Sequence, residues 1–223
     1  KDNSRFWYVP DDIQTKISEW IGDRLYLYNN SYGSEYSKLL AALETKIKEV
    51  CPDLIILDNL MTIDLSEQGN NEYQAQTNLM LQLHEVAEKY NCHIALVAHP
   101  RKTTTFLRLV DISGSGNIAN LVDSAFIVHR NNHDFRKGFL AEFCDKNTKE
   151  NDILLFKQGT NMIEIAKDRE EGIQDEFIPL WYEAESRRIK NAETEVIKYQ
   201  WTSEWEEDEE GNPFIGVDND EGF

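Results

Sequence analysis

Two short, wholly apolar segments constrain the fold of this chain more than any other feature. The first is Leu54–Leu57, which runs directly into Asp58. The second is Ile94–Ala98, which runs directly into His99. Between them, residues Glu72–Tyr90 have the apolar spacing of an amphipathic helix. Wholly apolar strands separated by long helices are typical of βαβ units in a parallel sheet that is buried on both faces.

The neighbouring segments extend this alternation of helices and strands. Residues Ser34–Val50 repeat apolar side chains at helical spacing, and Ser34 is suited to cap the helix. Two further apolar segments, Leu25–Tyr28 and Ala125–Val128, predict strands. Residues Ile118–Leu121 predict a short turn of helix before the second of these.

The character of the chain changes after residue 130, where short apolar stretches alternate with turn residues. This pattern is typical of antiparallel hairpins. The predicted strands are Phe139–Phe143, Ile153–Phe156, Met162–Ala166, Phe177–Tyr182 and Arg187–Lys190. The predicted fold class is therefore α/β, with a mainly parallel sheet flanked by helices and an antiparallel C-terminal extension.

The charge of the chain limits how it can bind other molecules. The sequence has 23 lysine and arginine residues against 41 aspartate and glutamate residues, a formal net charge of −18. This excludes nucleic-acid binding through bulk positive charge, so any such binding requires a local basic patch. The 3 cysteines have no metal-ligand spacing, and no apolar run approaches the roughly 18 residues of a membrane span. We therefore expect a cytoplasmic protein with reduced thiols and no membrane partner.

Much of the negative charge lies near the C-terminal end. Residues 203–223 contain nine acidic residues and no basic residue, and a Gly-Asn-Pro sequence interrupts any helix there. This composition predicts a disordered acidic tail. The tail either keeps the protein soluble or serves as a docking peptide, in which the terminal aromatic residue, Phe223, would anchor in a pocket of a basic partner.

The two polar strand ends are the first candidates for a functional site. In a parallel sheet the carboxyl ends of the strands meet at one edge, where the loops diverge and ligands bind. An acid that follows four aliphatic residues, as Asp58 does, can reach a nucleotide-bound Mg²⁺ directly or through water. Taken alone, Asp58 and His99 also fit a purely structural role at the strand ends.

Several motifs occur in one order along the chain, and together they are far more specific than any one of them. The segments are Asp53–Leu60, Ile94–Lys102, Asp111–Gly116, Asn120–Asp123 and Ile165–Gly172. Asp53–Leu60 resembles the Walker B strand of RecA-like replicative DNA helicases, and Ile94–Lys102 resembles their sensor strand. Asp111–Gly116 and Asn120–Asp123 resemble their DNA-binding loop and the segment that follows it. Ile165–Gly172 resembles the segment that carries their arginine finger. The resemblance covers roughly residues 25–190, and the most similar types are the phage primase–helicases and Twinkle, with the DnaB type next.

The resemblance implies a RecA-like sheet and a site for Mg²⁺ and ATP or another NTP. Asp58 would hold Mg²⁺ through water, and His99 would sense the γ-phosphate. Arg169 would be the arginine finger that reaches the ATP held by the adjacent subunit, and Lys167 would approach the same phosphate. By themselves, Lys167 and Arg169 would indicate only an exposed charge pair on a hairpin. The other implied nucleotide-binding residues are Asn59, Asn120 and Arg130.

The resemblance also implies that the loop from Arg101 to Gly116 binds single-stranded DNA in the channel of a homo-oligomeric, hexameric ring. The loop supplies positive charge, hydroxyl groups and glycines whose backbone N–H groups can approach phosphate. Its predicted DNA-binding residues are Arg101, Lys102, Arg108, Gly114, Ser115, Gly116 and Asn117. A small basic loop from each subunit would reconcile DNA binding with an acidic exterior. As an isolated segment it would be an ordinary polar loop.

Parts of the helicase pattern are not found in the sequence. It has no G-x-x-x-x-G-K-[S/T] phosphate-binding loop. We therefore expect residues 1–202 to form a partial RecA-like helicase ATPase domain without its first strand, phosphate-binding loop and following strand, inactive in ATP hydrolysis alone. The missing half belongs to a longer chain or to another polypeptide, or the protein is a degenerate relative. Residues 131–160 are longer than the connection that the helicases have at this point. The longer stretch would form a surface hairpin or alter the contacts between subunits.

These implications give two hypotheses. The first is the C-terminal part of an ATP-dependent replicative DNA helicase, phage-encoded and located in the host cytoplasm, that translocates on single-stranded DNA and unwinds duplex at a replication fork. Its acidic tail, residues 203–223, would contact the replicative DNA polymerase. The second is a non-catalytic RecA-like replication accessory that recruits the polymerase through this tail. A RecA-type recombinase or clock-type ATPase is a third option, which the His-Pro-Arg-Lys and Lys-x-Arg-x-x-Gly segments disfavour.

Overall fold

The computed structural model describes residues 9–29, 33–69, 71–101, 106–114 and 116–196. The chain divides into two compact parts, and the larger one, Asn29–Glu195, contains every described strand. The predicted acidic tail, with Phe223, lies outside the described residues. None of the helices in the described ranges is long and apolar enough to cross a membrane.

The smaller part contains helix α1 (Asp11–Ile21), which has no buried residue. The strand predicted at Leu25–Tyr28 is not formed, and Leu27 in this segment is 85% exposed. A strand requires a hydrogen-bonded neighbouring strand, and none of the strands in the described ranges includes or pairs with this segment.

The first region of the larger part confirms the predicted βαβ unit. Strand β1 (Leu54–Asp58) and strand β2 (His93–Val97) pair in parallel, and helix α3 (Glu72–Tyr90) connects them. Asn71 caps α3, because its side chain accepts a hydrogen bond from the N–H of Gln74.

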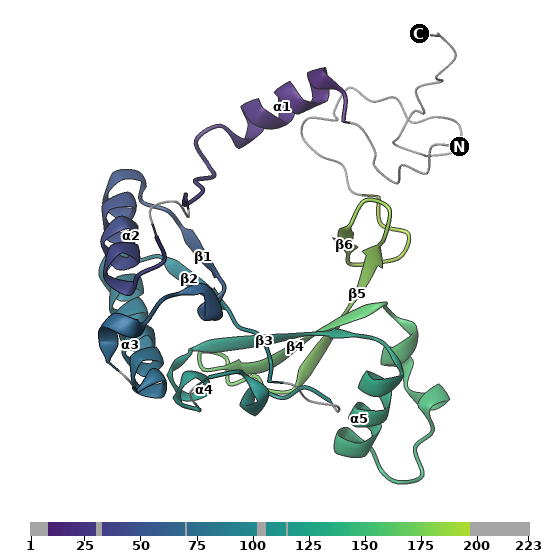
Figure 1. The fold of residues 1–223 in the computed structure, drawn as a ribbon. Coiled ribbons are helices and arrows are strands. Elements are labelled where there is room, and N and C mark those ends of the chain that lie inside the picture. Colours follow the sequence, from purple (N-terminus) through teal and green to yellow (C-terminus); the bar gives the residue numbers. More distant parts are fainter. Residues whose placement is uncertain (1–8, 30–32, 70, 102–105, 115, 197–223) are drawn as a thin grey trace, which may run out of the picture. The chain divides into compact units, whose positions relative to one another are not determined.

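Helices α2 (Tyr36–Val50) and α3 lie on one side of this strand pair, as Figure 1 shows. The N-cap of α2 is Glu35 and not the predicted Ser34, and no side-chain bond caps it. The buried residues of the core on this side are Tyr36, Leu60, Leu79, Met80, Leu83 and Ile118. On the other side, Leu54 is 55% and Ile56 63% exposed. The described elements therefore cover one face of the pair, whereas the apolar pattern predicts burial of both faces.

The second region is a four-stranded antiparallel sheet with the strand order β3-β4-β5-β6. Its strands are β3 (Ser124–Arg130), β4 (Asn161–Asp168), β5 (Glu176–Glu183) and β6 (Arg188–Lys190). The sequence predicts that β3 extends the parallel sheet, but β3 pairs with β4 in antiparallel register. The architecture is thus mixed α/β, with a small parallel sheet and a separate antiparallel sheet.

Two of the predicted hairpin strands are helical. Helix α5 (His133–Phe143) and the 3-10 helix η6 (Leu154–Lys157) replace the strands predicted at Phe139–Phe143 and Ile153–Phe156. The phenylalanines at 135, 139 and 143 recur every four residues, which is the spacing of one helix face. Phe135 and Phe139 pack in a second core with Met162 of β4, and the ring of Phe143 contacts the rings of Phe139 and Phe177. The remaining short helices are η2 (Leu60–Thr62), η3 (Ser66–Gln68), η4 (Leu109–Asp111), α4 (Asn117–Leu121) and η5 (Glu150–Asp152).

Candidate functional site

The carboxyl ends of β1 and β2 bring two predicted site residues into contact. Asp58 is exposed at the end of β1, opposite Val97 in the register. The side-chain Nδ2 of the next residue, Asn59, lies 3.1 Å from Nε2 of His99. The two strand ends are therefore joined by a side-chain hydrogen bond.

The orientation of the Asn59 amide follows from its second hydrogen bond. Its Oδ1 accepts the N–H of Met61 at 3.0 Å, at the start of η2. The Nδ2 group must therefore donate toward His99, and Nε2 of the imidazole is the acceptor. The proton of a neutral His99 ring then lies on Nδ1, from which it can be donated to an anionic oxygen.

The fit of Mg²⁺ to this edge depends on Asp58. The Oδ1 of Asn59 is already engaged by Met61, so Asp58 is the carboxylate that the strand end offers. Within the ranges that the structure describes, no group of three or more His, Cys, Asp or Glu side chains could hold a metal ion. A single carboxylate fits Mg²⁺, because this ion keeps several waters and is bound largely through substrate phosphates.

Backbone hydrogen bonds close the base of the loop predicted to bind DNA. The N–H of Ser113 donates to the carbonyl of His99 at 2.9 Å, and the N–H of Arg101 donates to the carbonyl of Asp111 at 2.7 Å. The guanidinium Nη2 of Arg101 donates to the carbonyl of Gly114 at 2.8 Å. The base of the loop is thus attached directly to the end of β2.

The other predicted residues of the loop differ in their surroundings. Lys102, the threonines at 103–105 and Ser115 lie outside the described residues. Gly114 has a φ of +127°, and a Cβ at this position would lie 2.5 Å from Oε1 of Gln76 on α3. Only glycine therefore fits here. Gly116 and Asn117 are exposed at the start of α4.

Arg108 is engaged by carboxylates. Its Nη1 lies 2.8 Å from Glu164, its Nη2 2.7 Å from Asp175 and its Nε 3.2 Å from Glu142. Burial works to lower the pKa of Arg108, but the hydrogen bond with Asp175 and the charges of the three carboxylates raise it above its ordinary value. This arrangement favours a structural role, and the DNA contact of Arg108 stays a prediction.

A second group of predicted residues meets at the C-terminal end of α4. Lys167 Nζ donates to the carbonyl of Ala119 at 2.9 Å. Arg169 donates to the carbonyl of Asn120 and, at 3.0 Å, to Oδ1 of Asp123. Both cations thus satisfy helix-end carbonyls. Burial and the neighbouring charge of Arg169 lower the pKa of Lys167, while Asp123 acts in the opposite direction.

Arg130 lies away from this second group. At one end of β3, Ser124 pairs with Asp168, close to Arg169, and at the other end Arg130 pairs with Asn161. The seven-residue strand separates the two ends by about 20 Å. The structure therefore does not bring Arg130 together with Lys167 and Arg169 as one nucleotide-binding cluster.

Sequence reasoning did not assign site roles to three residues that support these groups, namely Asp123, His129 and Glu164. Glu164 is fully buried in β4, and its Oε2 lies 2.7 Å from Nε2 of the buried His129 on β3. The local sequence predicts the opposite environment, because Glu164 lies between Ile163 and Ile165, and a polar residue that alternates with apolar ones is expected to face solvent. In the structure Glu164 shares the inward face of β4 with Met162. An acid at such a position indicates a buried partner.

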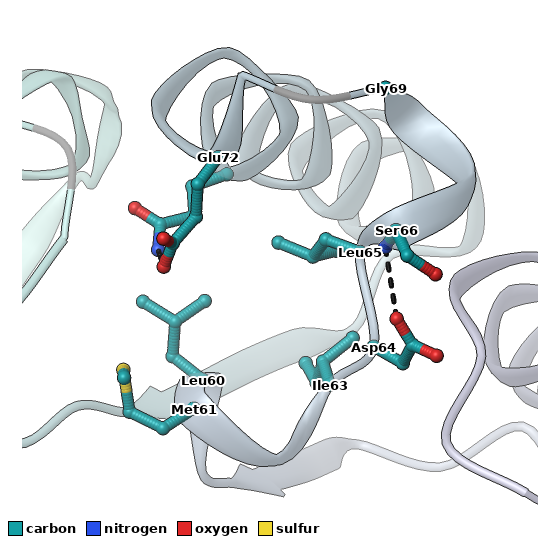
Figure 2. A pocket seen from close by; sticks show the side chains of 9 residues that line it. Leu60, Met61, Ile63, Asp64, Leu65, Ser66, Gly69 and Glu72 are labelled. Atoms are coloured by element: carbon teal, nitrogen blue, oxygen red, sulfur yellow. Dashed lines mark hydrogen bonds between the residues drawn. The ribbon is translucent and has the colours of Figure 1, made fainter.

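A cavity of about 230 Å³ lies next to η2 and η3. Figure 2 shows apolar side chains of Leu60, Ile63 and Leu65 beside the carboxylates of Asp64 and Glu72. Carboxylates repel phosphate groups, and none of the predicted site residues belongs to the described lining. The cavity therefore does not coincide with the predicted nucleotide site.

The comparisons with known proteins concern the first group of residues. Residues 9–105 match a family model described as an AAA domain, a span that includes Asp58, Asn59 and His99 but less than half of the chain. No curated protein sequence matches the chain. The match supports, at this coarse level, a relationship of the chain to nucleotide-binding, RecA-like ATPases.

Proposed function

We propose that the chain is part of an NTP-dependent replicative DNA helicase that translocates on single-stranded DNA as a ring, most simply a hexamer. The observation that carries the proposal is a continuous set of contacts from Asn59 through His99 to Ser113. It connects the strand end expected to face the nucleotide with the loop expected to face DNA. A motor needs such a connection, because the state of the nucleotide must change the grip on DNA.

At the nucleotide, the side chains have complementary roles. Asp58 would hold Mg²⁺ through water, and the bound ion would neutralise charge on the phosphates. His99 would donate a hydrogen bond from Nδ1 to the γ-phosphate while Nε2 stays on Asn59. The phosphate-binding loop that this proposal requires is not encoded in residues 1–223, so another segment or chain must supply it.

The second group would act on a neighbouring subunit. Arg169 would leave the carbonyl of Asn120 and reach the ATP of the adjacent subunit, where its charge stabilises the transferring phosphoryl group. Lys167 would approach the same phosphate. Residues 203–223, with Phe223 as the aromatic anchor, would dock on the replicative DNA polymerase, a proposal that rests on the charge of this segment and its terminal phenylalanine.

The test is the Arg169→Ala variant of the full-length protein. We expect DNA-stimulated ATP hydrolysis to fall by roughly 1,000-fold or more, with nucleotide binding largely unchanged. The matched control is Arg187→Ala, which removes an exposed arginine between β5 and β6. Normal DNA-stimulated hydrolysis by Arg169→Ala would remove the arginine-finger assignment.

One observation favours a second function, a non-catalytic RecA-like accessory that recruits the polymerase. Lys167 and Arg169 are held within their own chain by α4 and Asp123, an arrangement that requires no neighbouring subunit. The accessory would show tail-dependent polymerase binding and no DNA-stimulated hydrolysis in any pairing. Unaltered polymerase binding after deletion of residues 203–223 would count against docking in both functions.

A further inference from the structure

Residues 131–160, expected to form a surface hairpin or to alter subunit contacts, pack against the loop predicted to bind DNA. From this stretch, Phe135 of α5 and Phe156 of η6 join Met162 of β4 in the second core. Phe106, on the returning side of the loop, is only 6% exposed and belongs to the same core. One side of the loop is therefore built into the antiparallel region.

Aromatic rings and a glycine surround the side chain of Phe106. Its ring stacks on His129, with the ring centroids 4.9 Å apart and the planes 7° from parallel. Phe135 and Phe177 lie 5.4 Å and 6.2 Å from it, measured between ring centroids. A Cβ at Gly138 of α5 would lie 2.2 Å from the Cβ of Phe106. The position of Phe106 thus depends on a glycine in α5.

Arg108, two residues further along, is held by charge. Its main buried partner is Glu164, which is also bonded to His129, so that one carboxylate holds both side chains. The guanidinium carbon of Arg108 lies 5.3 Å from the ring centroid of Phe143 on α5. Leaving a buried charge without its partner is costly, so such a cluster favours one arrangement of its members.

We infer that helix α5 and Glu164 clamp the returning side of the loop, residues 106–113, and that Glu164 is a positioning residue for Arg101. The clamp reaches Arg101 through Asp111. The Oδ2 of Asp111 accepts the N–H of Arg108 at 2.8 Å, and its carbonyl accepts the N–H of Arg101 at 2.7 Å. The clamp stands on these contacts alone, whereas its use in DNA binding rests on the proposed function.

Hydrogen exchange of backbone amides in the full chain tests the clamp. Glu164→Gln keeps the size of the side chain and removes its charge. We expect exchange at Arg101, Asp111 and Ser113 to become about tenfold faster, with the β1–β2 amides unchanged. The matched control, Glu142→Gln, removes an exposed carboxylate that contacts the same guanidinium, and should change exchange less than about twofold.

A second variant keeps the test decisive if Glu164→Gln does not fold. Alanine is a better helix former than glycine, so Gly138→Ala should leave the α5 amides at least as protected as before. Its added methyl group must displace Phe106, and exchange at Asp111 and Ser113 should rise. Unchanged exchange of the loop amides in Gly138→Ala would overturn the clamp.

Binding of a fluorescently labelled oligothymidine strand tests the positioning role. We expect Glu164→Gln and Gly138→Ala to bind about tenfold more weakly than the wild type, because Arg101 loses its defined place. Val86→Ala, which destabilises the separate core around Ile47 and Cys92, should bind normally and so controls for general loss of stability. Faster exchange with unchanged affinity would uphold the clamp and overturn the positioning role. A wild type without affinity would contradict the proposed function, and the exchange data would still decide the clamp.

Discussion

The two sheet regions of the larger part place their polar groups differently. Around β1 and β2, the buried core side chains carry no charge, and Asp58 and His99 lie exposed at the strand ends. Around the antiparallel sheet, the core itself contains the carboxylate of Glu164, shared by His129 and Arg108. One region thus presents polar groups at its surface, and the other uses a charge inside its core.

Because of this difference, the two sheet regions are suited to different tasks. Apolar packing is non-directional, so the core beneath β1 and β2 supports the strand ends and packs against Ile112 of the loop that follows without a directional contact between side chains. A buried carboxylate with defined partners favours a single geometry. The antiparallel region therefore suits the task of holding residues 106–113 in one conformation, while the parallel region suits the task of facing a ligand.

The largest effect on stability should come from Glu164→Leu. It leaves the guanidinium of Arg108 and the ring of His129 without their shared acceptor, so we expect the free energy of unfolding to fall by about 4 kcal/mol. Urea denaturation measures this loss. The double variant Arg108→Met/Glu164→Leu removes both charges and should recover about half of it. A double variant no more stable than Glu164→Leu would show that the unpaired charge of Arg108 is not the cause of the loss.

The corresponding change in the parallel region is Leu79→Ala. Leu79 is fully buried on α3, so we expect a loss of about 3 kcal/mol in the free energy of unfolding. Leu81→Ala, on the same helix but 46% exposed, should cost less than about 0.5 kcal/mol. Hydrogen exchange should rise in β1 and β2 more than in β4 and β5. An equal rise in both sheets would mean that the two regions unfold as one unit and would weaken the comparison.

The sequence predicts the parallel region better than the antiparallel one. The βαβ unit can be read from Leu54–Leu57 and Ile94–Ala98, because an apolar strand and an amphipathic helix have distinct periods. Helix α5 is missed because Phe139–Phe143 is short and apolar, and such a segment fits a strand or a helix equally well. Only the spacing of four residues between Phe135, Phe139 and Phe143 indicates the helix. The pairing of β3 with β4 depends on long-range contacts that no local pattern encodes.

The sequence likewise predicts some contacts of the candidate site and not others. The contact of Asn59 with His99 follows the rule that parallel strand ends meet at one edge. The surroundings of Arg108 do not follow from its sequence position, because its partners Glu164 and Asp175 lie more than 50 residues away along the chain. A basic residue in a polar loop is expected to face solvent, and only the folded sheet shows that this one faces carboxylates.

Asp123→Asn tests the exposed charge contact of the second group. The pair of Arg169 and Asp123 is half-exposed, so its loss should lower the free energy of unfolding by less than about 1 kcal/mol. The proposed function further predicts that DNA-stimulated hydrolysis falls about tenfold, because the guanidinium of Arg169 loses part of its orientation. Thermal unfolding and steady-state kinetics measure the two quantities. Glu49→Gln, which removes an exposed ion pair with Lys46 on α2, is the control, and faster hydrolysis by Asp123→Asn would show that the contact restrains Arg169 instead.

The smallest effect should come from Glu183, at the exposed end of the antiparallel region. Hydrogen bonds from Ser186 and Arg188 lower the pKa of Glu183 to about 2, from an ordinary value of 4.5. A carboxyl whose pKa is lower in the folded state stabilises the fold above pH 4.5 and loses this contribution as the pH falls toward 2. Because solvent screens the group, we expect about 1 kcal/mol or less.

Urea denaturation at several pH values between 6 and 2 measures this contribution as a slope. Glu183→Gln should flatten the decline of the unfolding free energy below pH 4.5, and Glu185→Gln, an exposed residue of the same turn, should leave it unchanged. Glu164 and Glu183 both pair with an arginine, but the side chain of Glu164 is fully buried and that of Glu183 is 30% exposed. If removing Glu183 lowered the free energy of unfolding as much as removing Glu164, burial would not be what determines how much each charge contributes to stability.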